Sequence, residues 1–325
     1  MAHRLNIGKD GRANMMYYSG EGPVWHGLGT PVDHPATAKE AIEVARLNYT
    51  VEKRPMYVGS EQVPEKSATL RTDNGAILGV VGDRYQIVQN TEAFDFFDTL
   101  VGEGQAIYTA AGAINKGELI WVMAKLPKQL TLAREDIVEK NLVLVNSHDG
   151  SHALKVYFTP VRVICWNTLS ASFKDARDGV YIRHSGNIKN KVEEARRVLG
   201  ISIKWYTEFE ELCKQLVSTP ITEAKAEEYY DKLIYGNTPE EKKEESAILK
   251  NRMQDMMHLF KHGKGNRGET AWDWLNGSTE YYDHGRQIKG ETADPTNRLK
   301  SIWFGAAAKA KERAFSLALQ VAGVN

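Results

Sequence analysis

Cysteine is scarce in this 325-residue chain, and its two cysteines, Cys165 and Cys213, form no motif. They have neither the spacing of a zinc site nor the density of a secreted disulfide scaffold. Net charge is also absent, since 42 lysines and arginines balance 42 aspartates and glutamates. No segment approaches the ~20 apolar residues of a membrane span, and the N-terminus lacks the apolar core of a signal peptide. These absences predict a cytoplasmic protein without a membrane partner, in which any nucleic-acid site is a local patch.

The motifs of common catalytic sites are missing too. There is no GxxxxGK(S/T) phosphate loop and no GxSxG elbow, and the GxGxxG match at 263–268 follows a predicted helix instead of a strand. His148, Asp149 and His152 stand where a hairpin turn is predicted, which favours a turn over a metal site. We therefore predict no catalytic residue, no metal and no cofactor. An enzyme that uses region 262–286 is an alternative. Its candidate residues are His262, Lys264, Arg267, Glu280 and Asp283.

Apolar periodicity divides the chain into a strand-rich half and a helical half. Strand patterns occupy 49–59, 68–73, 76–89, 106–114, 118–127, 141–147 and 152–159. Helical patterns occupy 36–47, 90–104, about 160–172 and most of the chain after residue 187. This segregation predicts an α+β fold, with a β-meander and short helices in the N-terminal half and an all-helical C-terminal half.

Three regions are predicted along the chain. Residues 1–35 are rich in glycine and proline and read as an arm or loop without regular structure. Within this arm, Trp25 and Leu28 are expected to contact either the body of the protein or a neighbouring subunit. Residues 36–186 are predicted to form the α+β core domain, and residues 187–325 a helical region packed on that core.

The charge balance fails in one stretch, residues 155–204. Ten bases against four acids give it a charge of +6, and aromatic residues are interspersed among the bases. Cations neutralise phosphates and aromatic faces stack on bases, so the mixture is typical of a site for single-stranded nucleic acid. A solvated basic face beside ordinary core aromatics is the alternative. The predicted DNA-binding residues are Lys155, Tyr157, Arg162, Lys174, Arg177, Tyr181, Arg183, His184, Lys189, Lys191, Arg196 and Arg197.

Four parts of the chain together carry a family resemblance. They are WHGLGTP at 25–31, DRYQIVQNTEAFDFFDTL at 83–100, VRVICWNTL with IRHSGNIKNKV within 161–192, and GETAWDWLNGSTEYYDHG with SIWFGAAAKAKERAF within 268–315. The combination resembles a phage- and plasmid-like family of undefined function that is named for its Leu-Gly-Thr motif, present here as Leu28-Gly29-Thr30. The resemblance implies a phage, prophage or plasmid setting, and so the cytoplasm of a host bacterial cell.

A more distant resemblance rests on Ile87-Val88-Gln89-Asn90, followed by Phe94, Phe96 and Phe97 and then the predicted meander. A strand, an aromatic helix and a meander in this order are similar to the core of the Rad-type, Redβ, RecT and Erf single-strand annealing proteins. The resemblance implies rings or filaments that hold one DNA strand in a basic groove and pair it with a second strand without ATP. The implied partners are single-stranded DNA, further copies of the chain, and a phage or host single-strand-binding protein.

The first hypothesis is therefore a single-stranded DNA-binding and strand-annealing protein of recombination that needs no ATP. The acidic run at 240–247 must then face away from the DNA. The second hypothesis is a phage-encoded interaction protein that blocks or triggers a host defence system. For that role the aromatic loop 20–31 and the helical half would supply the contacts. The enzyme that uses region 262–286 is the third.

Overall fold

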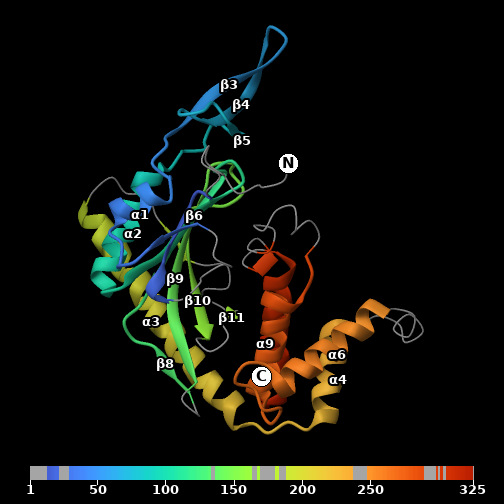
Figure 1. Ribbon diagram of the computed structural model, residues 1–325. Coiled ribbons are helices and arrows are strands. Elements are labelled where there is room, and N and C mark those ends of the chain that lie inside the picture. The colour runs from blue at the N-terminus through green and yellow to red at the C-terminus, as the bar shows by residue number, and fades with distance from the viewer. Residues whose placement is uncertain are drawn as a thin grey trace.

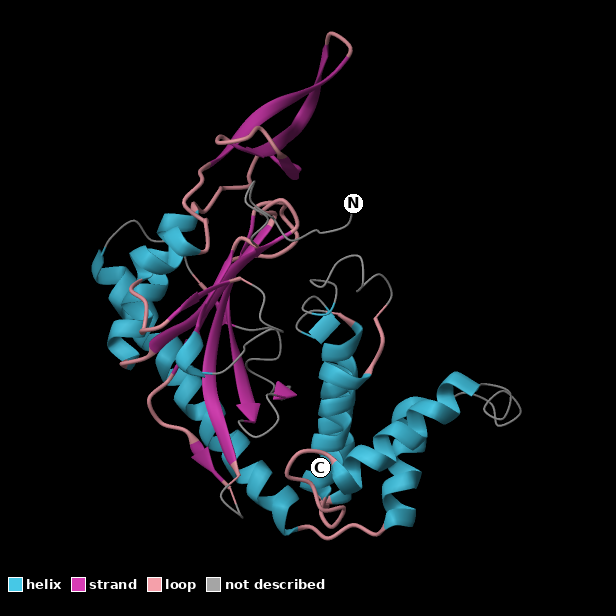
Figure 2. Ribbon diagram, viewed as in Figure 1, coloured by secondary structure: helices cyan, strands magenta, loops and turns pink. Residues whose placement is uncertain are grey.

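A computed structural model describes residues 13–21, 29–132, 136–162, 167–168, 180–182, 188–236, 247–288, 298, 301–302 and 305–324. Figure 1 shows a sheet backed by helices, a narrow ribbon of strands that projects beyond the sheet, and a group of helices away from the ribbon. Figure 2 shows strands in the first two parts and helices in the third. The predicted α+β class is therefore confirmed, with sheets in the N-terminal half and helices in the C-terminal half.

The larger sheet contains nine strands within the described residues. Its centre is the predicted meander, in which β6, β7, β9 and β10 are antiparallel neighbours. At one edge β1 pairs with β6, and β2 adds parallel to β1. At the other edge β11 and β12 both pair with β10, while β8 pairs with β9. The strands are β1 (Met15–Tyr18), β2 (Thr30–Val32), β6 (Ile107–Ile114), β7 (Leu119–Lys125), β8 (Leu130–Thr131), β9 (Ile137–Ser147), β10 (Lys155–Arg162), β11 (Asn167–Thr168) and β12 (Val180–Tyr181).

Three helices cover one face of this sheet (Figure 1). They are α1 (Ala38–Val44), α2 (Asn90–Gly104) and the first part of α3 (Ile188–Ser218). On α2, Phe94 and Phe97 recur at helical spacing and are buried, as the sequence predicts. They belong to the same core as alternate strand residues such as Val122 and Val156, because successive side chains of a strand point to opposite faces. The opposite face carries a smaller apolar cluster that includes Met15, Trp121 and Met123.

The projecting ribbon is a separate three-stranded antiparallel sheet (Figure 1). It consists of β3 (Val51–Val58), β4 (Glu61–Arg71) and β5 (Ile77–Gly82). Its far end is exposed, with Tyr57 at 59% and Val58 at 75% of their full accessibility. Its near end is buried, since Leu70 and Arg71 are at most 8% exposed. The ribbon is therefore anchored at one end.

The helical half contains a second core, to which Leu130 of β8 and Val138 of β9 also contribute. It is formed by the last part of α3 together with α4 (Glu223–Ile234), α6 (Ala247–His262), α7 (Ala271–Glu280), a π-helical turn (Tyr281–Gly285) and α9 (Ala306–Val321). Trp274 of α7 lies at its centre, fully buried and stacked on Tyr230 at 4.8 Å between ring centroids. Among the helices that the structure describes, none combines the length and apolar character that a membrane crossing requires.

Two local predictions are wrong. Residues 1–35 do contain regular structure, since β1 and β2 are strands too short for their alternation to be visible. The helix predicted after Pro160 is contradicted, because β10 continues to Arg162 and β11 follows; short apolar runs do not distinguish strand from helix. Helix α2 begins after its N-cap Gln89, whose backbone N–H donates to the Glu92 carboxylate at 2.9 Å. Helix α3 runs unbroken through Gly200.

Candidate nucleic-acid interface

Two of the predicted DNA-binding residues form a cation–π pair on the β10–β12 ladder of the large sheet. Lys155 of β10 stands directly opposite Tyr181 of β12 in the ladder. The Lys155 ammonium lies 4.1 Å from the centroid of the Tyr181 ring. A cation over an aromatic face is attracted by the ring quadrupole, so the pair orients the ring. Tyr181 is nonetheless 57% exposed, which leaves much of this aromatic residue accessible to a ligand.

A third predicted residue, Arg197 of α3, contacts the backbone of Tyr181 in this pair. Its guanidinium donates to the carbonyl oxygen of Tyr181 at 2.9 Å. It also donates two hydrogen bonds to the Glu194 carboxylate, at 2.8 and 2.6 Å. These bonds with Glu194 raise the pKa of Arg197, and the acid offsets its charge. Arg197 therefore positions Tyr181, while Lys155 supplies the less compensated positive charge.

Tyr157 occupies a different environment from Tyr181. It lies two residues after Lys155 on β10, and it is half-buried against the apolar cluster that contains Met15 and Trp121. Its ring is therefore a packing group of the sheet. Tyr181 is the better stacking candidate of the two.

The remaining predicted residues are not brought together by the described part of the structure. Arg196 is exposed on α3, next to Arg197. The backbone places Arg162 at the end of β10, and Lys189 and Lys191 in the first turn of α3. Outside the described residues lie Lys174, Arg177, Arg183, His184, Trp25 and Leu28.

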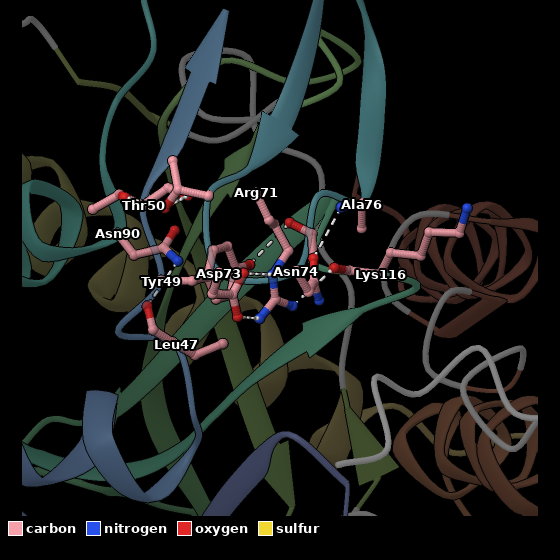
Figure 3. Close-up of polar contacts among 11 residues, drawn as sticks. Leu47, Tyr49, Thr50, Arg71, Asp73, Asn74, Ala76, Asn90 and Lys116 are labelled. Atoms are coloured by element: carbon pink, nitrogen blue, oxygen red, sulfur yellow. Dashed lines mark hydrogen bonds and ion pairs between the residues drawn. The ribbon is translucent and has the colours of Figure 1, made fainter. Parts of the chain in front are cut away.

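A polar cluster that the sequence did not reveal joins the ribbon to the large sheet (Figure 3). The buried Arg71, at the near end of β4, donates to both oxygens of Asp73 at 2.9 and 2.6 Å and to the carbonyl of Lys116 at 3.0 Å. Its guanidinium also lies 3.7 Å from the centroid of the Tyr49 ring. The Tyr49 hydroxyl donates to the carbonyl of Gly117 at 3.0 Å. The turn between β6 and β7 is thereby fixed to the ribbon, so Arg71 sets the direction in which the ribbon projects.

The substitution Arg71→Ala is expected to loosen the ribbon. It removes charge-assisted hydrogen bonds to Asp73 and leaves the Lys116 carbonyl without this donor, a loss of about 2 kcal/mol in free energy of unfolding. Hydrogen exchange of β3–β5 amides, followed by mass spectrometry, should rise while exchange in α7 stays constant. Arg54→Ala, which removes an exposed arginine paired with Glu52 on the same ribbon, is the control. Equal exchange in the two variants would show that Arg71 is no anchor.

A model of the family described as Domain of unknown function (DUF932) matches residues 77–303, more than two thirds of the chain. The chain belongs to this family. No curated protein and no solved structure matches the chain. The DUF932 match begins at the first residue of β5, so it includes Lys155, Tyr181 and Arg197. Arg71 and helix α1 precede it.

The residues of the alternative enzyme site fall in the DUF932 region, where several of them make contacts within the helical half. Asp283 is buried in an ion pair with Lys311, at 2.7 Å. Glu280 accepts the backbone N–H of Lys264 at 3.2 Å, and the ring of His262 lies beside that of His258. No group of three or more metal-binding side chains is found among the residues that the structure describes. These contacts are those of a packed helix end.

The His148-Asp149 motif of the DUF932 region forms the turn between β9 and β10. The Asp149 carboxylate accepts the backbone N–H of Ser151 at 2.8 Å and the Ser151 hydroxyl at 2.5 Å, which stabilises the turn. His148 is fully buried, and its Nε2 lies 2.7 Å from the amide oxygen of Asn90. Since that amide nitrogen donates to the carbonyl of Leu47, the oxygen accepts and Nε2 carries the proton. The motif is thus a structural junction between α2 and the turn.

Proposed function

We propose that the protein binds single-stranded DNA along the β10–β12 edge and anneals complementary strands without ATP. The observation that carries the proposal is the exposed Tyr181 ring, oriented by Lys155 and braced by Arg197. A base that stacks on this ring would bring its phosphate near the Lys155 ammonium. Stacking on aromatic side chains and neutralisation of phosphates are the two interactions by which proteins hold single strands without reading sequence.

The absence of net charge fits annealing better than tight coating of DNA. Binding confined to a +6 segment of a neutral chain neutralises few phosphates per subunit. A second strand can then compete for the bases, and Watson–Crick pairing selects the partner. Many weak sites along one strand also favour assembly of several copies, because each bound site raises the effective concentration of the next.

The sequence resemblances support the same function. The motif Leu28-Gly29-Thr30 and the other three stretches favour a phage, prophage or plasmid protein in the cytoplasm of a bacterial host. The similarity of residues 87–97 and the meander to annealing proteins favours a recombination role, with a homo-oligomer and a phage or host single-strand-binding protein as partners.

The proposal predicts distinct effects for two substitutions at the β10–β12 edge. Tyr181→Ala should weaken binding of a single-stranded oligonucleotide by about 1–3 kcal/mol, or roughly 5- to 150-fold in Kd, through loss of stacking. Lys155→Ala should reduce the slope of log K against log salt by about 0.7, the value for one phosphate contact on a single strand. Fluorescence anisotropy across a salt series measures both quantities.

Two matched controls lie elsewhere on the protein. Tyr57→Ala removes a tyrosine of similar exposure, 59%, from the ribbon. Lys232→Ala removes the cation of another lysine–tyrosine pair, 4.5 Å from the Tyr229 ring on α4. Both should bind DNA like the parent. Two results would show that DNA does not bind at the β10–β12 edge. One is an affinity that does not change with salt, and the other is control variants that bind DNA as weakly as Tyr181→Ala. If the protein bound single strands but did not accelerate the pairing of complementary oligonucleotides, annealing would be contradicted and DNA binding would stand.

A second candidate function is favoured by the ribbon. Tyr57 and Val58 expose large apolar side chains at the far end of a projecting β-hairpin, a form suited to contact with another protein. This would fit the phage-encoded protein that blocks or triggers a host defence system. Tight binding to a host protein that Tyr57→Ala abolishes, with no binding to DNA, would favour it over annealing.

A further inference from the structure

A second surface of the protein carries the charge opposite to that of the β10–β12 edge. Among the side chains that the structure describes, helices α1 and α2 hold five acids against one lysine, a charge of −4 in a chain with no net charge. The acids are Glu40, Glu43, Glu92, Asp95 and Asp98, and the lysine is Lys39. Such a surface repels DNA and attracts cations, so the annealing proposal assigns it no role.

A cavity of about 590 Å³ lies between these two helices and the start of β6. Its inner lining includes the buried apolar side chains of Ile42 and Phe94, which are 7% and 2% exposed. Its volume falls within the range of natural ligand pockets, and its lining combines apolar with polar side chains. We name it the α1–α2 groove.

Polar residues line both walls of the α1–α2 groove. Thr91, Asp95 and Asp98 line it and are exposed. Their spacing places them on one face of α2 over about 10 Å. Lys39 lines the groove from α1. Asp95 and Asp98 therefore make the α2 wall acidic, whereas Lys39 places a positive charge on the α1 wall.

Asp98 is fixed at the groove by a buried tyrosine. The hydroxyl of Tyr108, a residue that is 2% exposed, donates to the Asp98 carboxylate at 3.3 Å. Burial raises the pKa of Tyr108, and the Asp98 and Asp95 carboxylates raise it further, so the hydroxyl keeps its proton and remains a donor. Because a carboxylate accepts several hydrogen bonds, Asp98 retains capacity for a second donor from a ligand.

We propose that the α1–α2 groove docks a segment of a partner protein in which a lysine or arginine stands next to a large apolar side chain. The apolar side chain contacts Ile42 and Phe94, and the cation pairs with Asp95 and Asp98. Lys39 disfavours a second cation on the α1 wall and so fixes the direction of the segment. The groove and the DNA-binding edge are built on different elements, so both can be occupied at once.

The test uses fluorescence anisotropy with the full chain and a short fluorescein-labelled helical peptide of leucine, alanine and lysine. A peptide with every lysine replaced by glutamate is its partner probe. The lysine peptide should bind and the glutamate peptide should not. Asp95→Asn with Asp98→Asn should weaken the lysine peptide about tenfold. Thr91→Trp, at an exposed rim position, should block the groove without altering its charge.

The matched control is Glu208→Gln with Glu211→Gln, an equal charge change at exposed positions of α3. It should bind the lysine peptide like the parent. Equal binding of the two peptides, or parental binding by Thr91→Trp, would overturn the proposal. Self-association of the parent that the Asp95/Asp98 variant loses in sedimentation would assign the groove to a second copy instead, and so also overturn it. DNA binding by the Asp95/Asp98 variant should persist, which separates this test from that of the annealing function.

Discussion

Replacing Lys311 by alanine is expected to lower the free energy of unfolding by about 3–5 kcal/mol. Lys311 of α9 is fully buried, and its ammonium lies 2.7 Å from the carboxylate of Asp283, which is 1% exposed. Burial lowers the pKa of Lys311, and the Asp283 charge opposes this shift. In the alanine variant the Asp283 carboxylate stays buried in the helical core but loses the Lys311 ammonium. Urea denaturation followed by circular dichroism measures the loss.

A double substitution distinguishes removal of both charges of the Lys311–Asp283 ion pair from removal of the lysine alone. Lys311→Met with Asp283→Asn removes both charges while keeping most of the volume, so it should recover at least half of the stability lost in Lys311→Ala. Lys309→Ala, an exposed lysine on the same helix, should change stability by less than about 0.5 kcal/mol. If Lys311→Ala were as stable as Lys309→Ala, Asp283 would not depend on this pair, and an active-site role for Asp283 would regain support.

The local elements of the fold were predictable wherever chemistry within a few residues decides them. The turn between β6 and β7 needs left-handed backbone at Asn115 and Gly117, with φ of 59° and 102°, and asparagine and glycine are the residues that tolerate it. The aromatic face of α2 was predictable from its helical spacing. The strands β1 and β2 were not, because three or four residues show no periodicity and their stability comes from pairing with distant β6.

The sites were less predictable than the fold, because sequence gives charge but not burial. Arg71 and Lys311 resemble surface cations in the sequence, yet both are nearly inaccessible and hold distant segments together. Conversely, counting charges in the sequence revealed the +6 stretch. The pairing of Lys155 with Tyr181 could be recognised only from the β10–β12 ladder of the structure. The α1–α2 groove depends on two helices separated by the entire ribbon in the chain.

Acidification is expected to destabilise the junction of ribbon and sheet through His148. Burial lowers the pKa of His148 from 6.5 to about 4; nearby Asp149 opposes the shift and Arg71 adds to it. Above pH 6.5 the imidazole is neutral in both the folded and unfolded chain, so it adds no pH dependence. Between pH 6.5 and 4 the unfolded chain binds a proton that the folded chain does not. This difference removes about 3 kcal/mol of stability in total.

The measurement is urea denaturation of the parent and of His148→Asn at pH 7.5 and 4.5. The titration of aspartates and glutamates changes the free energy of unfolding equally in both proteins. The parent should therefore lose about 2.5 kcal/mol more of its free energy of unfolding than the variant over this interval. His34 is the opposite case, since hydrogen bonds to Asp33 and Glu40 raise its pKa, and its contribution is present at acidic pH and lost as the pH rises. His148 contacts Asn90, and its carbonyl accepts the hydroxyl of Thr69 on β4 at 2.7 Å, so its protonation should first free the near end of the ribbon. Equal losses in parent and variant would mean that His148 already binds a proton in the folded state, and that the junction does not respond to acid.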